Sequence, residues 1–358
     1  MFDDRYRESD VRRELGMSLA LACGCVALGL VNPDFWSSAN LLNTVRHIAM
    51  LGTYALGLAF VIIAGGIDLS AGSIIGLTGV TIAALLGAGA PVWMAVSVAM
   101  AVSLLAGLCQ GALITYLKLQ PFIVTLGGML LLRGVSQVIT NGGTISLGET
   151  PFRDLADGGL IRVGYAYLLP YPVLIFGTVT LLAMYALHYT VFGRYVYAIG
   201  GNRDAAVYSG VSVRRVEMTT YIMSAGLAGV AGVVYGAYIG QMSHTVGTAY
   251  ELVGIAACVL GGCSLRGGEG TVTGVIIGSA LMKVVENSIN MFKLTYHDAA
   301  GIAHEWRLNT NWQYLVIGAV ILFAVILDQG GHQLRDRWLK MRFMQKRCDL
   351  RNRGLGLR

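Results

Sequence analysis

Two glycines and an aspartate interrupt a long apolar run in the string Gly65-Gly66-Ile67-Asp68-Leu69-Ser70-Ala71-Gly72. Paired glycines break a helix, and an Asp or Ser can restart one by accepting hydrogen bonds from the freed amides. Irregular backbone at membrane depth is tolerated only where protein buries it or where it lines a wet cavity. The string therefore predicts an N-cap by Asp68 for a helix that begins near Leu69, or a polar element of a transport path, and the two roles are compatible.

A similar string recurs in the second half of the chain, Gly261-Gly262-Cys263-Ser264-Leu265-Arg266-Gly267-Gly268. Both strings follow the pattern Gly-Gly-x-(Asp/Ser)-Leu-x-x-Gly, and each precedes a glycine-spaced apolar stretch. Paired glycine-interrupted segments are typical of an internal repeat, parallel or inverted, with a substrate path at its interface. We predict such a repeat, and a translocation path bordered by residues of both strings: Gly65, Gly66, Asp68, Ser70, Gly72, Gly261, Gly262 and Ser264.

A third constellation, Gly200 to Gly210, starts with glycine breakers and a capping-type Asn, runs about two helical turns and ends at glycine. A short amphipathic helix between two spans cannot cross a membrane, and it suits the docking of a soluble partner. The alternative is a solvated connector. If the segment docks a partner, the residues that carry the contact are Asn202, Arg203, Asp204, Ala205, Ala206 and Gly210.

Charged residues also fall inside apolar stretches. They are Arg133 and the pair Lys283 and Glu286. The members of the pair are three residues apart, so they share a helix face, and pairing offsets the cost of burying a charge. A proton relay would require more carboxylates or histidines within the spans, whereas His47 and His188 lie near span ends. This distribution argues against a proton-driven pump.

Enzyme motifs are missing from the sequence: it contains no Gly-x4-Gly-Lys-(Ser/Thr), Gly-x-Ser-x-Gly or His-Glu-x-x-His. We therefore expect a chain that is not an enzyme and that binds neither a cofactor nor a metal itself. The cysteines have neither zinc spacing nor the character of a disulfide framework. They lie in apolar runs, beside a helix break or in the basic tail: Cys23, Cys25, Cys109, Cys258, Cys263 and Cys348.

Composition indicates what must position these residues. The chain of 358 residues is 55% hydrophobic and only 13% charged, against about 25% charged in soluble domains. Apolar stretches near the length of a spanning helix predict an all-α polytopic membrane protein with about ten transmembrane helices, some of them broken. The stretches are about 17–31, 42–64, 72–88, 91–116, 121–140, 168–190, 217–240, 249–262, 270–292 and 312–327.

Lys and Arg residues indicate the orientation. Most of them fall in segments that would share one side, and basic residues concentrate on the cytoplasmic side of a membrane. We predict a cytoplasmic N-terminal segment 1–16, a transmembrane domain 17–327 whose cytoplasmic loop spans about 191–216, and a basic cytoplasmic tail 328–358. The net charge of +6 is concentrated in that tail, which suits anionic lipid headgroups and not nucleic acid.

Four stretches, in this order, resemble the ribose-, xylose- and arabinose-type permeases of bacterial ABC importers over about residues 40–328. They are Ala64-Gly65-Gly66-Ile67-Asp68-Leu69-Ser70-Ala71-Gly72-Ser73; Pro121-Phe122-Ile123-Val124-Thr125-Leu126-Gly127 with Leu132-Arg133-Gly134; Phe192-Gly193-Arg194-Tyr195-Val196-Tyr197-Ala198-Ile199-Gly200-Gly201-Asn202; and Val259-Leu260-Gly261-Gly262 with Gly267-Gly268-Glu269-Gly270. In addition, Asp204-Ala205-Ala206-x3-Gly210 is similar to the Glu-Ala-Ala-x3-Gly loop by which such permeases dock their ATPase.

The resemblance implies a subunit of the bacterial inner membrane that works as a dimer, as two copies or with a similar permease. It also implies an ATPase subunit that holds ATP and Mg²⁺, and a periplasmic binding protein that delivers a small sugar. The chain departs from the family in a longer loop at 293–311 and in the tail after Asp328. The alternatives are a branched-chain amino-acid-type ABC permease, which is a related architecture, and a channel or membrane scaffold outside the ABC class.

Overall fold

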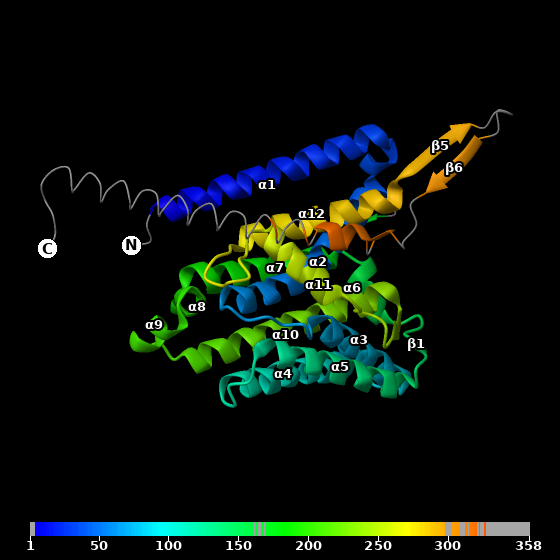
Figure 1. The fold of residues 1–358 in the computed structure, drawn as a ribbon. Coiled ribbons are helices and arrows are strands. Elements are labelled where there is room, and N and C mark those ends of the chain that lie inside the picture. The colour runs from blue at the N-terminus through cyan, green and yellow to red at the C-terminus, as the bar shows by residue number, and fades with distance from the viewer. Residues whose placement is uncertain are drawn as a thin grey trace, which may run out of the picture.

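The computed structural model describes residues 4–160, 162–163, 166–167, 169–297 and 303–307, together with 312–313, 315–320, 322 and 326. Helices dominate this part of the chain (Figure 1). They are α1 Asp4–Val31, η1 Pro33–Trp36, α2 Ser38–Ile63, α3 Ala71–Gly87, α4 Val92–Thr115, α5 Pro121–Thr140, η2 Pro151–Arg153, α6 Asp154–Asp157, α7 Tyr171–Met184, the π-helical turn η3 Tyr185–Tyr189, α8 Val191–Gly201, α9 Arg203–Tyr208, α10 Val213–Ile239, α11 Tyr250–Leu260 and α12 Val272–Met291.

Among the described residues, seven helical segments are long and apolar enough to cross a membrane. They are Arg13–Val31 within α1, α2, α4, α5, Tyr171–Tyr189 (α7 with η3), α10 and α12. Large apolar side chains on the outer helices face away from the protein, for example Leu19, Leu105, Leu131 and Leu182. An exposed apolar surface of this kind is compatible with lipid and not with water, and it confirms the predicted all-α polytopic membrane class.

Helix α2 forms the centre of the bundle. It packs against α10, α12, α7 and α11, and every residue from Ala49 to Ile63 is buried. A helix that is apolar all round can be accommodated only inside a larger core, and this run of the sequence has that character. Helix α10 lies beside it and packs in turn on α3 and α4, so α2 and α10 form the framework on which the shorter elements rest.

Helix α1 lies on the outside of the bundle, against α12 (Figure 1). Glu14 accepts hydrogen bonds from Thr271 and Thr273, both 2.5 Å long, and Asn32 Nδ2 donates to the Met291 carbonyl at 2.9 Å. These contacts fix the middle and the C-terminal end of α1 against the two ends of α12. The helix begins at Asp4 and continues through the segment 1–16 that we expected to precede it.

Three short antiparallel pairs of strands complete the described chain. They are β1 Thr144–Ser146 with β4 Gln241–Ser243, β2 Arg162–Val163 with β3 Ala166–Tyr167, and β5 Lys293–His297 with β6 Ala303–Arg307. In Figure 1, β1, β5 and β6 lie at one end of the bundle, called here the β1 end, and α8 and α9 lie at the other, the α9 end.

Nine of the ten predicted stretches form helices within the described residues, with differences in length. Two of the ten predicted stretches, 72–88 and 249–262, form the short helices α3 and α11. Irregular backbone adjoins each of them, at 64–70 before α3 and at 261–271 after α11. The stretch 312–327 lies only partly within the described residues, and the tail 328–358 with Cys348 lies outside them.

Candidate functional site

The two glycine breaks meet each other and the end of α8 at the α9 end of the bundle. The Gly268 amide donates a 2.8 Å hydrogen bond to the Ile63 carbonyl, which joins the second break to the end of α2. A Cβ on Gly200 would overlap both of those backbone atoms, and a Cβ on Gly267 would lie 2.8 Å from Gly65 Cα and 3.0 Å from Gly200 Cα. Three backbone segments therefore touch directly, which only glycine permits.

Asp68 holds the first break from within. Its Oδ1 accepts hydrogen bonds from the Ser70 amide at 2.8 Å and the Ser70 hydroxyl at 2.6 Å. Its Oδ2 accepts from the Ser224 hydroxyl at 2.7 Å, near the middle of α10. Asp68 is 2% exposed and Ser70 and Ser224 are also buried. Helix α3 begins at Ala71, later than predicted, with Ser70 as its N-cap residue, because Asp68 closes a turn ahead of it.

The second break repeats the local geometry of the first. Ser264 Oγ accepts from the Arg266 amide at 3.3 Å, as Asp68 accepts from the amide two residues on. Both breaks also contain a glycine with positive φ just after the preceding helix, +85° at Gly65 and +86° at Gly262. The preceding helices α2 and α11 pack on each other, and Cys258 of α11 donates a hydrogen bond to the Ala55 carbonyl of α2. That the two strings form an internal repeat stays a prediction.

The beginnings of α3 and α11 face each other inside the bundle. A Cβ on Gly72 would overlap Glu251 Oε2 and the Gly247 carbonyl, so α3 lies directly against the first turn of α11. A carboxylate in a first helical turn is stabilised by the positive end of the helix dipole. Among the described residues, Glu251 Oε2, Ser73 Oγ and Arg133 Nε and Nη2 are enclosed without a hydrogen-bond partner. The sequence analysis identified Arg133 and missed Glu251.

Helix α9 forms the tip of the α9 end. The Asn202 side chain accepts from the Ala205 amide at 2.9 Å, as an N-cap does, and Gly210 closes the segment with a φ of +80°. Arg203 forms a two-contact ion pair with Glu217 of α10, 2.8 and 3.1 Å long. This hydrogen bonding raises the pKa of the Arg203 guanidinium above its usual range. Tyr208 is 90% exposed, a large side chain with no cover in the chain itself.

The predicted loop 191–216 is largely helical, because α8 occupies Val191–Gly201 ahead of α9. Helix α8 is tied to the second break, since Tyr197 donates a 2.6 Å hydrogen bond to the Gly270 carbonyl. Only Asn202 separates α8 from α9. Gly200, near the end of α8, therefore connects α9 with both breaks by direct backbone contact.

A polar face of α2 runs from the β1 end toward the centre. Tyr238 of α10 donates to Asn43 Oδ1 at 3.2 Å and lies 3.2 Å from His47 Nε2. Lys283 and Glu286 pair at 2.6 Å on α12, so the predicted pairing is present, and Asn287 donates to Thr44 at 3.1 Å. Deeper in, Tyr54, Tyr235 and Tyr250 form a ring cluster, with Tyr54 stacked on Tyr250 at 6.4 Å between ring centroids.

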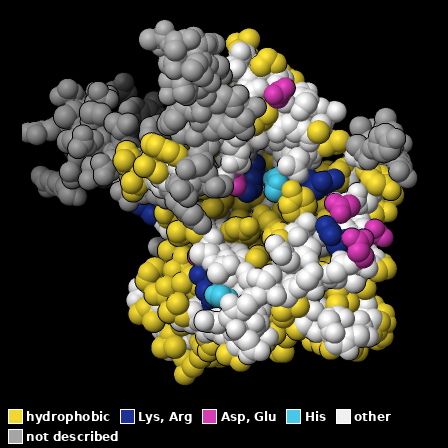
Figure 2. Space-filling view, turned by 90° about the vertical axis from the view of Figure 1, so that its right-hand side faces the viewer, with side chains coloured by type: hydrophobic (Ala, Val, Ile, Leu, Met, Phe, Trp, Pro, Cys, Tyr) yellow, Lys and Arg dark blue, Asp and Glu magenta, His cyan; other side chains and the backbone are white. Residues whose placement is uncertain are grey.

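A cavity of about 730 Å³ opens at the β1 end. Figure 2, which looks onto that end, shows basic, acidic and histidine side chains gathered around an area of hydrophobic ones. The cavity is lined by residues from the start of α2 and from the segment around α6 and β3: Ser37, Ala39, Asn40, Leu42, Asn43, Arg46, Asp157 and Tyr167. None of these was predicted as a site residue. Within the described residues, no three His, Cys, Asp or Glu side chains are arranged to hold a metal ion.

Comparison with known proteins places the chain in a family. A protein-family model described as the permease component of the branched-chain amino acid transport system matches residues 40–325. The ribose import permease of Escherichia coli K12 is 36% identical over 310 residues, covering 87% of this chain and 92% of that protein. The ribose import permease of Bacillus subtilis 168 is 35% identical over 327 residues, covering 91% and 95%.

A third relative, the xylose transport permease of Haemophilus influenzae Rd, is 33% identical over 354 residues, covering 83% of this chain and 90% of that protein. No solved structure matches the chain significantly. The family match spans most of the sequence, including both glycine breaks and α9, and it confirms the resemblance predicted from the motifs. This chain therefore belongs to the family of transport-system permease components that the model describes.

Proposed function

We propose that the chain is the membrane-spanning permease subunit of an ABC importer and that it moves a small sugar inward. The observation that carries this proposal is α9, a short capped helix at one end of the bundle, whose attachment point Gly200 packs on both glycine breaks. A projecting helix coupled to the interior in this way suits a protein that is driven by a partner. A channel or a scaffold has no need for this connection.

The sugar is favoured over an amino acid by the relatives. The family description carries the branched-chain amino-acid name, whereas the relatives compared above are ribose and xylose permeases at 33–36% identity over most of the chain. An amino-acid permease is therefore the less favoured alternative. The chain has none of the enzyme motifs named above, so we assign ATP and Mg²⁺ to a partner ATPase.

The partners and the orientation follow from this assignment. In the proposal the α9 end is cytoplasmic and contacts the ATPase, and the β1 end faces the periplasm and receives sugar from a binding protein. Both termini are cytoplasmic, in agreement with the position of the N-terminal part of α1 and with the basic residues of the tail. The working unit is a pair of permeases in the inner membrane. The pair consists either of two copies of this chain or of this chain and a similar subunit.

In this mechanism the partner's movement reaches the core by direct backbone contact. Docking of the partner displaces α9, and α8 moves with it. Helix α8 is fixed to the second break by Tyr197 and to the first break by Gly200, so both breaks are moved as well. The breaks then allow α3 and α11 to shift against α2 and α10. Alternating access in transporters uses discontinuous helices of this kind. That the residues of the two strings border the path stays a prediction, since Asp68, Ser70 and Ser264 are closed off from solvent in this conformation.

Substitutions in the α9 segment test the coupling. Gly210→Val places a β-branched residue at a φ of +80°, which L-residues adopt at a cost of about 1–2 kcal/mol. Asp204→Lys reverses the charge in the first turn of α9. Both variants should reduce copurification of the ATPase at least about tenfold, or about 1.4 kcal/mol, and abolish sugar uptake with normal membrane levels.

Asp154→Lys is the matched control, because Asp154 is an exposed acidic residue on the short helix α6, away from α9. This variant should copurify with the ATPase as the parent chain does. Unchanged ATPase binding and uptake in both α9 variants would mean that the segment is a plain connector.

A further inference from the structure

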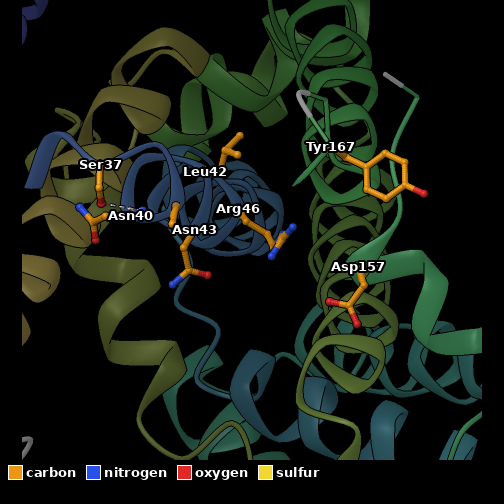
Figure 3. A pocket seen from close by; sticks show the side chains of 8 residues that line it. Ser37, Asn40, Leu42, Asn43, Arg46, Asp157 and Tyr167 are labelled. Atoms are coloured by element: carbon orange, nitrogen blue, oxygen red, sulfur yellow. Dashed lines mark hydrogen bonds between the residues drawn. The ribbon is translucent and has the colours of Figure 1, made fainter. Parts of the chain in front are cut away.

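Arg46 has an incomplete set of hydrogen bonds in the cavity at the β1 end. Its Nε is enclosed by protein, and no described residue accepts a hydrogen bond from it. An enclosed donor without an acceptor costs about 1–3 kcal/mol, and more when it is charged. Figure 3 shows Arg46 extending from α2 toward the side on which Asp157 and Tyr167 lie, whereas Asn43 points along α2's lower edge and the Tyr167 hydroxyl points away from α2. The guanidinium is therefore placed to bind something that enters the cavity.

The groups around the cavity fit a neutral, polyhydroxylated ligand. A sugar hydroxyl both donates and accepts, and the lining offers guanidinium and amide donors together with carboxylate and amide acceptors. Among the described lining residues, Arg46 is the one cation and Asp157 the one anion, so their formal charges balance. Tyr167 adds a flat apolar face of the kind that packs on a ring. The volume of about 730 Å³ lies within the range of small-molecule sites, about 300–1,000 Å³.

Polar contacts continue from the cavity along one face of α2. Asn43 lines the cavity and accepts from Tyr238, which in turn contacts His47 one turn deeper. Positions 43, 47, 50 and 54 share a helix face, and Tyr54 stacks on Tyr250 at the centre of the bundle. Tyr54 is 1% exposed, so the ring cluster is closed to solvent in the present conformation. The cavity thus lies at the outer end of a helix face that carries Asn43, His47 and, past the apolar Met50, the tyrosine cluster.

We infer that the cavity between α2, α6 and β3 is a sugar-binding subsite, in which Arg46, Asn43 and Asp157 hold the hydroxyls of the free sugar before the tyrosine cluster opens. The inference rests on the proposed function and adds a residue set and a location to it. The proposed subsite is separate from the two glycine strings, which lie deeper in the bundle and toward the α9 end. The same end of the bundle would receive a binding protein, so the experiment must separate the two events.

The test measures protection of a cysteine reporter. Ala39 lines the cavity and is exposed, so Ala39→Cys is placed in a full-length chain from which Cys23, Cys25, Cys109 and Cys348 have been removed. The permease, assembled with its ATPase in lipid nanodiscs, is labelled with a hydrophilic maleimide with and without D-ribose, D-xylose or L-leucine. Ribose or xylose should slow labelling at least fivefold, and leucine should not.

Arg46→Gln and Asp157→Asn should each raise the sugar concentration for half-maximal protection at least tenfold. Asp154→Asn is the matched control, an exposed carboxylate on the same short helix that does not line the cavity, and it should leave protection unchanged. Binding of the periplasmic protein to the nanodiscs should be equal in all of these variants.

Absence of protection by either sugar, in a preparation whose parent chain still transports one of them, would overturn the subsite and leave the proposed function standing. Protection by leucine alone would overturn both. Loss of binding-protein docking in Arg46→Gln with unchanged sugar protection would assign the cavity to docking and overturn the inference.

Discussion

Replacing Gly200 by alanine should abolish transport, whereas the same change at the neighbouring Gly201 should have almost no effect. A Cβ on Gly200 would overlap the Ile63 carbonyl oxygen and the Gly268 amide nitrogen, while one on Gly201 meets nothing within 4 Å. The overlapped atoms are backbone, so no flexible side chain can move aside, and overpacking of this kind costs about 1–3 kcal/mol. The two breaks must then separate from α8.

Sugar uptake and ATPase copurification from membranes, measured for both variants at equal expression, check this prediction. In Gly200→Ala the Gly268–Ile63 hydrogen bond is lost with the contact, so uptake should fall at least a hundredfold even where the chain remains inserted and α9 still binds the ATPase. Normal uptake in Gly200→Ala, or equal losses in the two variants, would show that this contact does not transmit the movement of α9.

The second large effect is expected at Asp68. Asp68→Ala removes the acceptor of three hydrogen bonds at once, from the Ser70 amide, the Ser70 hydroxyl and the Ser224 hydroxyl. Each buried donor left without a partner costs about 1–3 kcal/mol. The first break should therefore lose its fixed conformation, and both the thermal stability of the purified permease and its uptake should fall steeply.

Asp68→Asn is the informative companion variant, because its amide oxygen can still accept both bonds from Ser70. It should preserve folded protein and most of the uptake, and Ser224→Ala, which removes one of the three bonds, should cost less than Asp68→Ala. A thermal-shift series in detergent orders the three variants. An Asp68→Asn chain that is stable yet inactive would contradict this account and assign the carboxylate charge to the transport path.

Local sequence signals predicted much of the fold because the relevant physics is local. Apolar runs predicted the spanning helices, and the two Gly-Gly strings predicted where α2 and α11 end. Asn202 and Gly210 predicted α9 with its N-cap and its left-handed end, and the spacing of Lys283 and Glu286 predicted their pairing. In each case the residues that decide the structure lie within one or two helical turns of each other.

The remaining features depend on contacts between distant parts of the chain. Glycine pairs indicate a helix break, but they do not predict that Gly200 contacts Gly65 and Gly267. Glu251 is one acid at the start of an apolar helix, and its place against Gly72 follows only from the packing of α3 on α11. In the sequence, Arg46 is only a basic residue near the end of a predicted span. Its position across a cavity from Asp157 and Tyr167 follows from the fold.

Reconstituted transport tests the central claim most directly. The permease and its partner ATPase are placed in proteoliposomes with the periplasmic binding protein outside, and radiolabelled D-ribose, D-xylose and L-leucine are offered with ATP and Mg²⁺ enclosed. The account predicts that ribose or xylose accumulates against its gradient only when ATP, the ATPase and the binding protein are all present. Sugar equilibration by the permease alone would indicate a channel, and uptake of leucine without either sugar would indicate an amino-acid permease; both results would contradict the account.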